Sequence, residues 1–179
     1  MKKILLSLLL FLVNFSFAQN FLKIGYGSNG YRLGLDLQTD SYLFSYISLI
    51  AENKYEDGNS TINSENYSYT LNALYFNLGL MLKTKIKNLY INPFAKLRRA
   101  YFKIENSTYE GTKSTWKVGG GLNLAYYACI IPGFILIPQA YIYYMPKETF
   151  YFKNKKITEI GKNAFQIGLA LDLNIGFGN

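Results

Sequence analysis

The stretch AFQIGLALDLNIGFGN, residues 164–179, alternates between apolar and small or polar side chains at every step. The apolar set lies on one face of an extended chain and consists of Phe165, Ile167, Leu169, Leu171, Leu173, Ile175 and Phe177. Asp172 and Asn174 lie on the opposite face, among glycine and alanine. A two-residue period sustained this far predicts a β-strand longer than the usual length of about 5–6 residues. A tilted strand crosses a bilayer with about 9–11 residues, so the stretch is typical of a transmembrane strand.

Three further segments have the same two-faced pattern: YRLGLDLQ (31–38), LYFNLGLML (74–82) and TWKVGGGLNLAYY (115–127). In each, leucines and aromatic residues form one face, while Gly, Ala, Asn or Asp form most of the other. A half-buried soluble sheet favours Lys, Glu and Thr on its polar face, because that face meets bulk water. Small and amide side chains instead suit a narrow, enclosed, polar interior. The pattern therefore predicts apolar residues outside and polar residues inside.

The fold predicted from these segments is all-β, an eight-stranded antiparallel up-and-down transmembrane β-barrel. The expected strands are residues 20–28, 31–38, 42–55, 66–82, 89–105, 113–128, 134–146 and 162–178. Short connections alternate with longer polar ones such as 56–65 and 147–161, which is the layout of outer-membrane barrels. Residues 43–47 choose no face, and the fourth strand changes phase near Asn72, where we expect a β-bulge.

The amino terminus predicts export. Lys2 and Lys3 precede the apolar run Ile4–Val13, and Ser16-Phe17-Ala18 is a small-x-small cleavage signal. We expect a signal peptide over residues 1–18 and a barrel domain over 19–179. The whole chain carries a net charge of +8, and loss of Lys2 and Lys3 leaves +6. An uncleaved membrane anchor is the alternative, but the apolar run is shorter than the roughly 20 residues that a spanning helix needs.

Aromatic residues are abundant, with 17 Tyr and 13 Phe in the sequence. One set is expected at the long-loop ends of the strands: Tyr26, Tyr31, Tyr55, Tyr67, Tyr69, Tyr101, Trp116 and Tyr144. A second set is expected at the short-turn ends: Phe21, Tyr42, Tyr90, Tyr126, Phe134 and Phe177. Two aromatic girdles separated by aliphatic residues would match the two membrane–water interfaces.

The hexapeptide GYGSNG, residues 25–30, has the glycine spacing of a dinucleotide-binding loop. That motif requires a helix directly after it to hold the phosphates, and an alternating strand follows here instead. We interpret Asn29-Gly30 as a hairpin turn. The uncharged stretch from Val118 to Met145 could suggest membrane helices, but Pro132, Pro138 and a glycine triplet argue against them.

Charged residues on the expected inner faces of the strands form a polar cluster. Lys23, Asp36 and Asp172 fall on the first, second and eighth strands, which become neighbours when the sheet closes. We expect these three to cluster in the lumen, with further cations along it: Arg32, Lys96, Arg98 and Lys117. The role expected for them is structural, because ions in a narrow barrel must be paired or hydrated. A general acid/base pair of the two aspartates is the weaker interpretation.

Lysines crowd the longest expected loop: Lys147, Lys153, Lys155, Lys156 and Lys162. Lys153, Lys155 and Lys156 are candidates for contact with lipopolysaccharide phosphates, although a solvated loop face explains them as well. Dense Lys/Arg stretches with interleaved aromatics are absent from the sequence, so nucleic acid is not an expected partner.

A signal ending in SFAQ, the alternating segments and a terminal strand closing on Phe177 together resemble the small outer-membrane β-barrels of Gram-negative bacteria, the outer-membrane protein X/A-like family. The resemblance implies an outer-membrane location, lipid and lipopolysaccharide as surroundings, and insertion by the barrel-assembly machinery. Gly178 and Asn179 follow the aromatic residue, which departs from the usual terminal signal. The resemblance to this family also implies a non-enzymatic monomer without cofactors that acts in the envelope or in surface contact through its loops.

Two alternatives stay open. Some eight-stranded barrels modify lipid A, and the enzymes of this kind rely on a histidine, whereas this sequence contains none. A soluble periplasmic, lipocalin-like binder would reverse the faces, with Leu169, Leu171 and Leu173 pointing inward.

Overall fold

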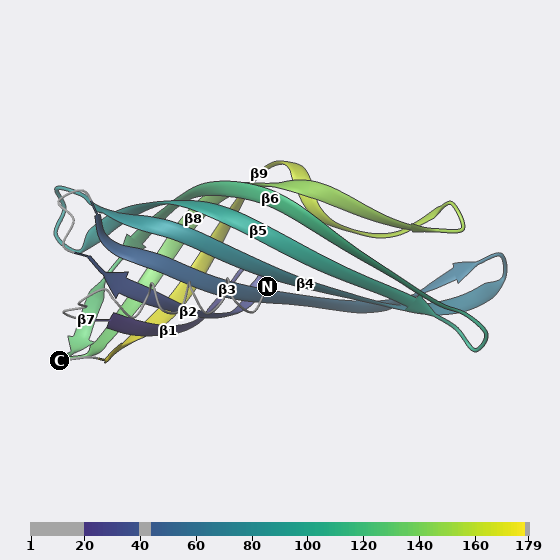
Figure 1. The fold of residues 1–179 in the computed structure, drawn as a ribbon, viewed down its shortest axis with the longest axis horizontal. Helices are drawn as coiled ribbons and strands as arrows, with labels where there is room; N and C mark the ends of the chain where they lie inside the picture. The colour runs from purple at the N-terminus through teal and green to yellow at the C-terminus, as the bar shows by residue number, and fades with distance from the viewer. Residues whose placement is uncertain (1–19, 40–43, 178–179) are drawn as a thin grey trace, which may run out of the picture.

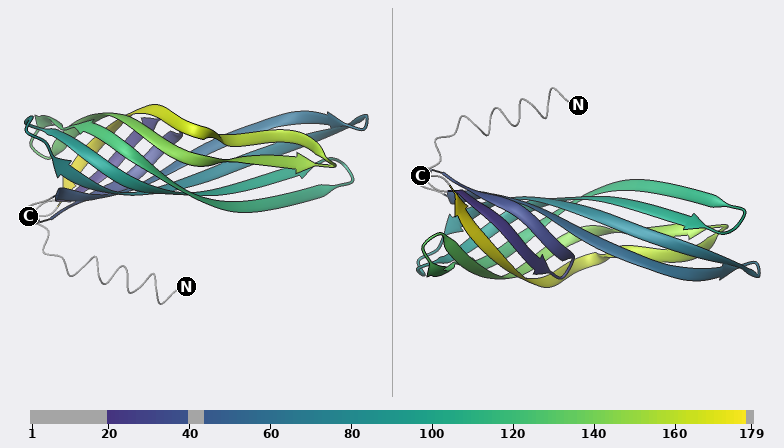
Figure 2. Two further views of the ribbon diagram at one scale, coloured as in Figure 1. Left: turned by 90° about the horizontal axis from the view of Figure 1, so that it is seen from above. Right: turned by 90° about the horizontal axis from the view of Figure 1, so that it is seen from below.

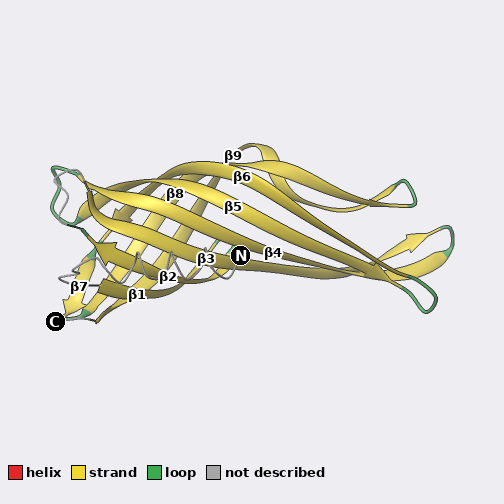
Figure 3. Ribbon diagram, in the orientation of Figure 1, coloured by secondary structure: helices red, strands yellow, loops and turns green. Residues whose placement is uncertain are grey.

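The computed structural model describes residues 20–39 and 44–177. Every regular element in this part of the chain is a strand (Figures 1 and 3), and it contains no helix long and apolar enough to cross a membrane. The expected signal peptide, residues 1–18, lies outside the described residues, as does Tyr42.

The strands are β1 (Asn20–Gly27), β2 (Gly30–Gln38), β3 (Phe44–Ile62), β4 (Glu65–Lys83), β5 (Leu89–Glu105), β6 (Glu110–Tyr126), β7 (Ala128–Ile131), β8 (Phe134–Phe152) and β9 (Lys155–Phe177). Each pairs antiparallel with its neighbours, β1 pairs with β9, and β6 pairs with β8. The sheet therefore closes into a ring of eight wall strands, which confirms the predicted fold. The short β7 pairs only with β8 and forms the turn that follows β6.

The outward and inward faces follow the predicted alternation. On β9, Leu169 and Leu171 are 67% and 51% exposed, whereas Asp172 and Asn174 are fully buried. Exposed apolar residues on other strands include Leu33, Phe76 and Val118. This orientation is opposite to the one that a lipocalin-like lumen requires, so that alternative is wrong.

Six wall strands extend well past the β1–β2 hairpin at the long-loop end of the barrel (Figures 1 and 2). Pairing of β2 with β3 ends at Asn53, and pairing of β1 with β9 ends at Ala170. Beyond these points the chain continues as the hairpins β3–β4, β5–β6 and β8–β9. Residues 56–62 and most of 147–161, which we expected to be loops, are therefore strand.

The β-bulge expected at Asn72 is wrong. β3 and β4 stay in one register from Tyr46 to Ile62, and the irregularity lies between Phe44 and Tyr46. The apparent phase change of β4 near Asn72 has another reason: its inward side chains are polar in the middle of the barrel and apolar in the outer hairpin. Asn77 faces the polar middle of the barrel, whereas Tyr67 and Leu71 belong to an apolar cluster further out.

The tight turn of the GYGSNG stretch is also displaced from the predicted position. Gly27 pairs with Gly30, so the turn residues are Ser28 and Asn29, and Gly30 rather than Asn29 has a positive φ of 104°. Asn29 is buried, and its side chain donates a 2.9 Å hydrogen bond to Glu52.

The aromatic girdles are correct in part. At the long-loop end, the exposed members are Tyr26, Tyr31, Tyr55, Tyr101, Trp116 and Tyr144, and at the short-turn end Tyr126 and Phe134. Tyr67 and Phe21 are buried instead, and Tyr90 packs against an interior cluster. The side chain of Phe177 is not among those described.

Candidate functional site

A chain of six alternating charges fills the middle of the barrel. Lys23 Nζ lies 2.9 Å from Asp36 Oδ1 and 4.0 Å from Asp172 Oδ2. Arg32 Nε lies 3.0 Å from Asp172 Oδ1, and Arg32 Nη1 lies 3.2 Å from Glu52 Oε1. Glu52 then contacts Lys96, at 2.7 Å. Three cations and three anions balance one another, which offsets the cost of burying each of them.

Glu52 is the member that sequence reasoning missed. It lies on β3, the strand whose start chose no face because of the irregularity between Phe44 and Tyr46. Counting in steps of two from Ser48 would have placed Glu52 on the inner face, since Ser48, Ile50 and Glu52 are all buried.

Neutral side chains satisfy the remaining acceptors of Asp36. Ser48 Oγ, Tyr127 Oη and Asn174 Nδ2 each donate a hydrogen bond of 2.7 Å to its carboxylate. Gln139 donates to Asp172. Both aspartates are therefore held as hydrogen-bonded, ion-paired carboxylates and are fully buried.

The two other predicted lumen cations lie apart from this chain. Arg98 is fully buried, and its guanidinium donates to two backbone carbonyl oxygens, those of Pro146 and Ile160. Lys117 faces inward near the outer end, where Nζ lies 3.1 Å from Glu148 Oε2 with the side chain 37% exposed. The structure thus brings together Lys23, Asp36, Asp172, Arg32 and Lys96, but not Arg98 or Lys117.

Aromatic layers close the interior on both sides of the charges. At the short-turn end, the Tyr127 ring lies 5.8 Å from the Tyr46 ring and 4.8 Å from the Tyr90 ring, measured between centroids. At the long-loop end, a larger apolar cluster includes Phe102 stacked on Phe150 at 4.9 Å. Between the layers, a cavity of about 20 Å³ is lined by residues such as Asn77, Asn92 and Glu52, which is room for one or two water molecules.

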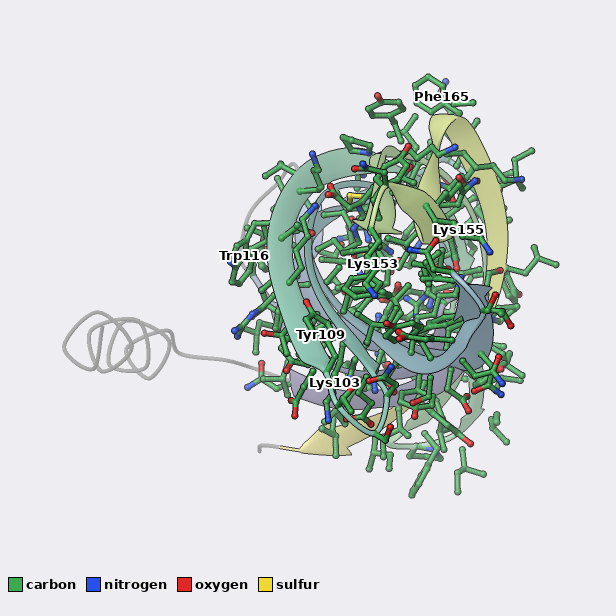
Figure 4. The ribbon with its side chains drawn as sticks, turned by 90° about the vertical axis from the view of Figure 1, so that its right-hand side faces the viewer. Lys103, Tyr109, Trp116, Lys153, Lys155 and Phe165 are labelled. Atoms are coloured by element: carbon green, nitrogen blue, oxygen red, sulfur yellow. The ribbon has the colours of Figure 1, made fainter. Side chains whose placement is uncertain are left out.

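Two of the loop lysines, Lys153 and Lys155 (labelled in Figure 4), contact the neighbouring β3–β4 hairpin. Lys153 Nζ donates a 2.8 Å hydrogen bond to Tyr67 Oη and lies 3.5 Å from Glu65, so it ties the β8–β9 tip to the β3–β4 tip. Lys155 donates to the carbonyl of Thr61, and Lys156 pairs with Glu159. The sequence made these lysines candidates for contact with lipopolysaccharide or members of a solvated loop face, and in the structure each contacts a protein group.

These contacts shift the pKa values of exposed groups. The hydrogen bond from Tyr67 and the charge of Lys153 lower the pKa of Glu65, and the hydrogen bond with Tyr67 raises the pKa of Lys153. Hydrogen bonds from Lys147 and Lys156 lower the pKa of Glu159. The tip contacts are therefore fully charged at neutral pH.

Residues 20–39 and 44–177 contain no group of three or more His, Cys, Asp and Glu arranged to hold a metal ion.

The barrel has apolar residues outside, a closed ring of eight strands and a filled interior. Solved structures of the same architecture exist. Ail of Yersinia pestis, in complex with the heparin analogue sucrose octasulfate, matches at a TM-score of 0.58 with 9% identity, over 89% of this chain and 98% of that one. This is the fold of a small outer-membrane β-barrel. A major outer-membrane protein of Thermus thermophilus matches at 0.57 with 12% identity, over 89% and 99% of the two chains. CarO2 of Acinetobacter baumannii matches at 0.50 with 8% identity, over 91% and 100%.

No protein-family model matches the sequence, and no curated protein is significantly similar to it. The likeness to the solved outer-membrane barrels is therefore one of fold.

Proposed function

We propose that this chain is a non-enzymatic, monomeric outer-membrane barrel that makes surface contacts through its long hairpins. One observation carries the proposal: strands of up to 23 residues continue past the lipid-facing band as three hairpins with an apolar core of their own. Strands that only spanned the membrane would need about 9–11 residues. The extra length therefore serves something outside the membrane.

The interior argues against transport and against catalysis. Paired charges and two aromatic layers fill the lumen, as expected for eight strands. The sequence contains no histidine to act as a base near neutral pH. Each buried carboxylate among residues 20–39 and 44–177 contacts a cation. We assign the charge chain a structural role on these grounds.

The expected partners follow from the proposed location in the outer membrane. They are outer-membrane lipid and lipopolysaccharide around the barrel, and the barrel-assembly machinery during insertion. Because Lys153, Lys155 and Lys156 contact the protein itself, any lipopolysaccharide bound by them would share these lysines with Thr61, Glu65 and Glu159.

The test combines location with orientation. An epitope inserted between Asn63 and Ser64, at the tip of the β3–β4 hairpin, should be detected on intact cells, and the protein should fractionate with the outer membrane. An epitope between Ile86 and Lys87, on the opposite rim, is the matched control and should need permeabilisation. Recovery in the soluble periplasm, or detection of both epitopes only after permeabilisation, would contradict the proposal.

A further inference from the structure

Arg99 is an exposed cation on the outer wall of the barrel, on the face opposite to the buried Arg98. Its guanidinium carbon lies 5.4 Å from the centre of the Trp116 ring, and the two residues are directly paired across β5 and β6. Within residues 20–39 and 44–177, no carboxylate forms an ion pair with it. The acids nearest in the sequence, Glu105 and Glu110, both contact Lys103 instead.

The position of Arg99 marks a boundary on the wall. On the short-turn side of Arg99 the outward residues are apolar, with Leu97 on the same strand and Val118 next to Trp116 on β6. On the long-loop side of Arg99 lies a row of polar side chains, in which Asn72, Tyr101 and Ser114 pair across three strands. Trp116 projects from the perimeter (Figure 4) at this level, as aromatic residues do at a membrane interface.

A groove in the apolar wall reaches Leu97 and Val118, which are the next outward residues after Arg99 and Trp116 on their strands. Its lining includes Leu33, Leu49, Phe76, Leu78, Ala95 and Leu97. Ala95 is the small residue among larger outward neighbours on β5, so it leaves the wall hollow there. The outer wall therefore combines a cation at the interface with an apolar groove that crosses the neighbouring strands directly next to it.

We propose that Arg99 and this groove bind a phosphorylated outer-leaflet lipid, with the phosphate of lipid A on the guanidinium and an acyl chain in the groove. A planar guanidinium presents several N–H donors that match a phosphate, and stacking on an indole leaves the edge of the fork free. Phosphates of the lipid headgroup lie at the depth of the aromatic girdle, where Arg99 stands. The inference rests on the proposed outer-membrane function but concerns a contact that can be measured in detergent.

Trp116, the one tryptophan of the sequence, reports on this site. Lipid A added to the folded barrel in a non-ionic detergent should shift Trp116 emission saturably. Arg99→Gln should weaken the apparent affinity about tenfold, the loss that removal of a strong charge-assisted contact gives. Lys87→Gln, on the opposite rim, is the control and should leave the affinity unchanged, and Arg99→Lys should fall between the two. Unboiled gel mobility shows that each variant is folded.

Three comparisons identify the ligand. Lipid A lacking its phosphates should bind as weakly to the wild type as phosphorylated lipid A does to Arg99→Gln. Ala95→Phe, which fills the groove without touching Arg99, should also weaken binding. Inorganic phosphate in the same micelles should cause no comparable shift. Equal affinity of Arg99→Gln and wild type, or an equal response to inorganic phosphate, would overturn the proposal. Because the assay is done in micelles, failure of the epitope test would leave its result unaffected.

Discussion

Arg98 Nη2 donates a 2.9 Å hydrogen bond to the carbonyl oxygen of Pro146. Its Nη1 donates at 3.2 Å to the carbonyl oxygen of Ile160 on the partner strand. These carbonyls lie where β8 and β9 lose register, between Met145 and Glu148, beside Gly161 with its φ of 82°. A guanidinium thus supplies donors to two carbonyl oxygens at the point where the ladder is irregular. The relationship explains a fully buried arginine that lies apart from the six-membered charge chain.

Arg98→Met should therefore destabilise the barrel, by about 1–3 kcal/mol, because two buried carbonyl oxygens lose their donors. The free energy of unfolding in urea and lipid vesicles measures this. Arg98→Lys, which keeps a donor of similar reach, should lose less. A Met variant as stable as the wild type would show that water replaces the guanidinium at no cost.

Asp172→Leu should lower stability more, by about 3–5 kcal/mol, because Arg32 and Lys23 lose a buried counter-charge. The unfolding temperature in detergent, read by gel mobility, checks this. Glu159→Leu removes a carboxylate from the exposed outer hairpin and is the control, with an expected change below about 1 kcal/mol. An unchanged unfolding temperature for Asp172→Leu would rule out a structural role for the charge chain.

The strand period predicted the membrane-facing half of the molecule well, because lipid imposes one requirement on every outward residue. β9 shows this most directly, since Leu169 and Leu171 face out and Asp172 faces in. The outer hairpins were harder to predict. There the inward face is apolar, as at Leu71 and Phe150, and the outward face is polar, so the pattern reverses along a single strand.

Two other features depend on three-dimensional contacts that periodicity does not encode. Glu52 was missed because an irregularity at the start of β3 hides the phase of that strand. The lysines of the β8–β9 tip carry no sequence signal that distinguishes a lipid partner from Glu65 on another hairpin. Position on a strand predicts which way a side chain points, but not which neighbour it meets.

Gly25→Ala should be harmful even though Gly25 belongs to no nucleotide site. A Cβ at Gly25 would clash with Asp172 Oδ1 and lie 2.5 Å from the backbone oxygen of Leu171, so the paired strand would have to move. Overpacking of this kind costs about 1–3 kcal/mol. The unfolding temperature should fall, and Arg32 should lose its contact with Asp172. At Gly27, where the nearest atoms lie at 3.1 Å, alanine is the milder control.

Acid should loosen the contact between the β3–β4 and β8–β9 tips. The folded pKa of Glu65 is lowered, so the contact stabilises the tips above the ordinary Glu range and is lost as pH falls through the folded value. The protection of residues 150–158 against hydrogen exchange, taken relative to the intrinsic exchange rate at each pH, should fall as the pH drops below the ordinary Glu range. Glu65→Gln should show lower protection at neutral pH and no further loss of protection in acid. Equal pH dependence in both proteins would place the titrating group elsewhere.

Removal of one aromatic layer should not open the lumen. Tyr127→Ala takes away the ring between Tyr46 and Tyr90, but the charge chain and the cluster around Phe102 and Phe150 still cross the interior. In planar bilayers, both the wild type and this variant should show no stepwise conductance, because two filled layers still block the lumen of the variant. Tyr127 also donates to Asp36, so the variant should be less stable while remaining closed. Conductance steps in Tyr127→Ala alone would show that this single layer is the barrier, and that the ions behind it leave a hydrated path.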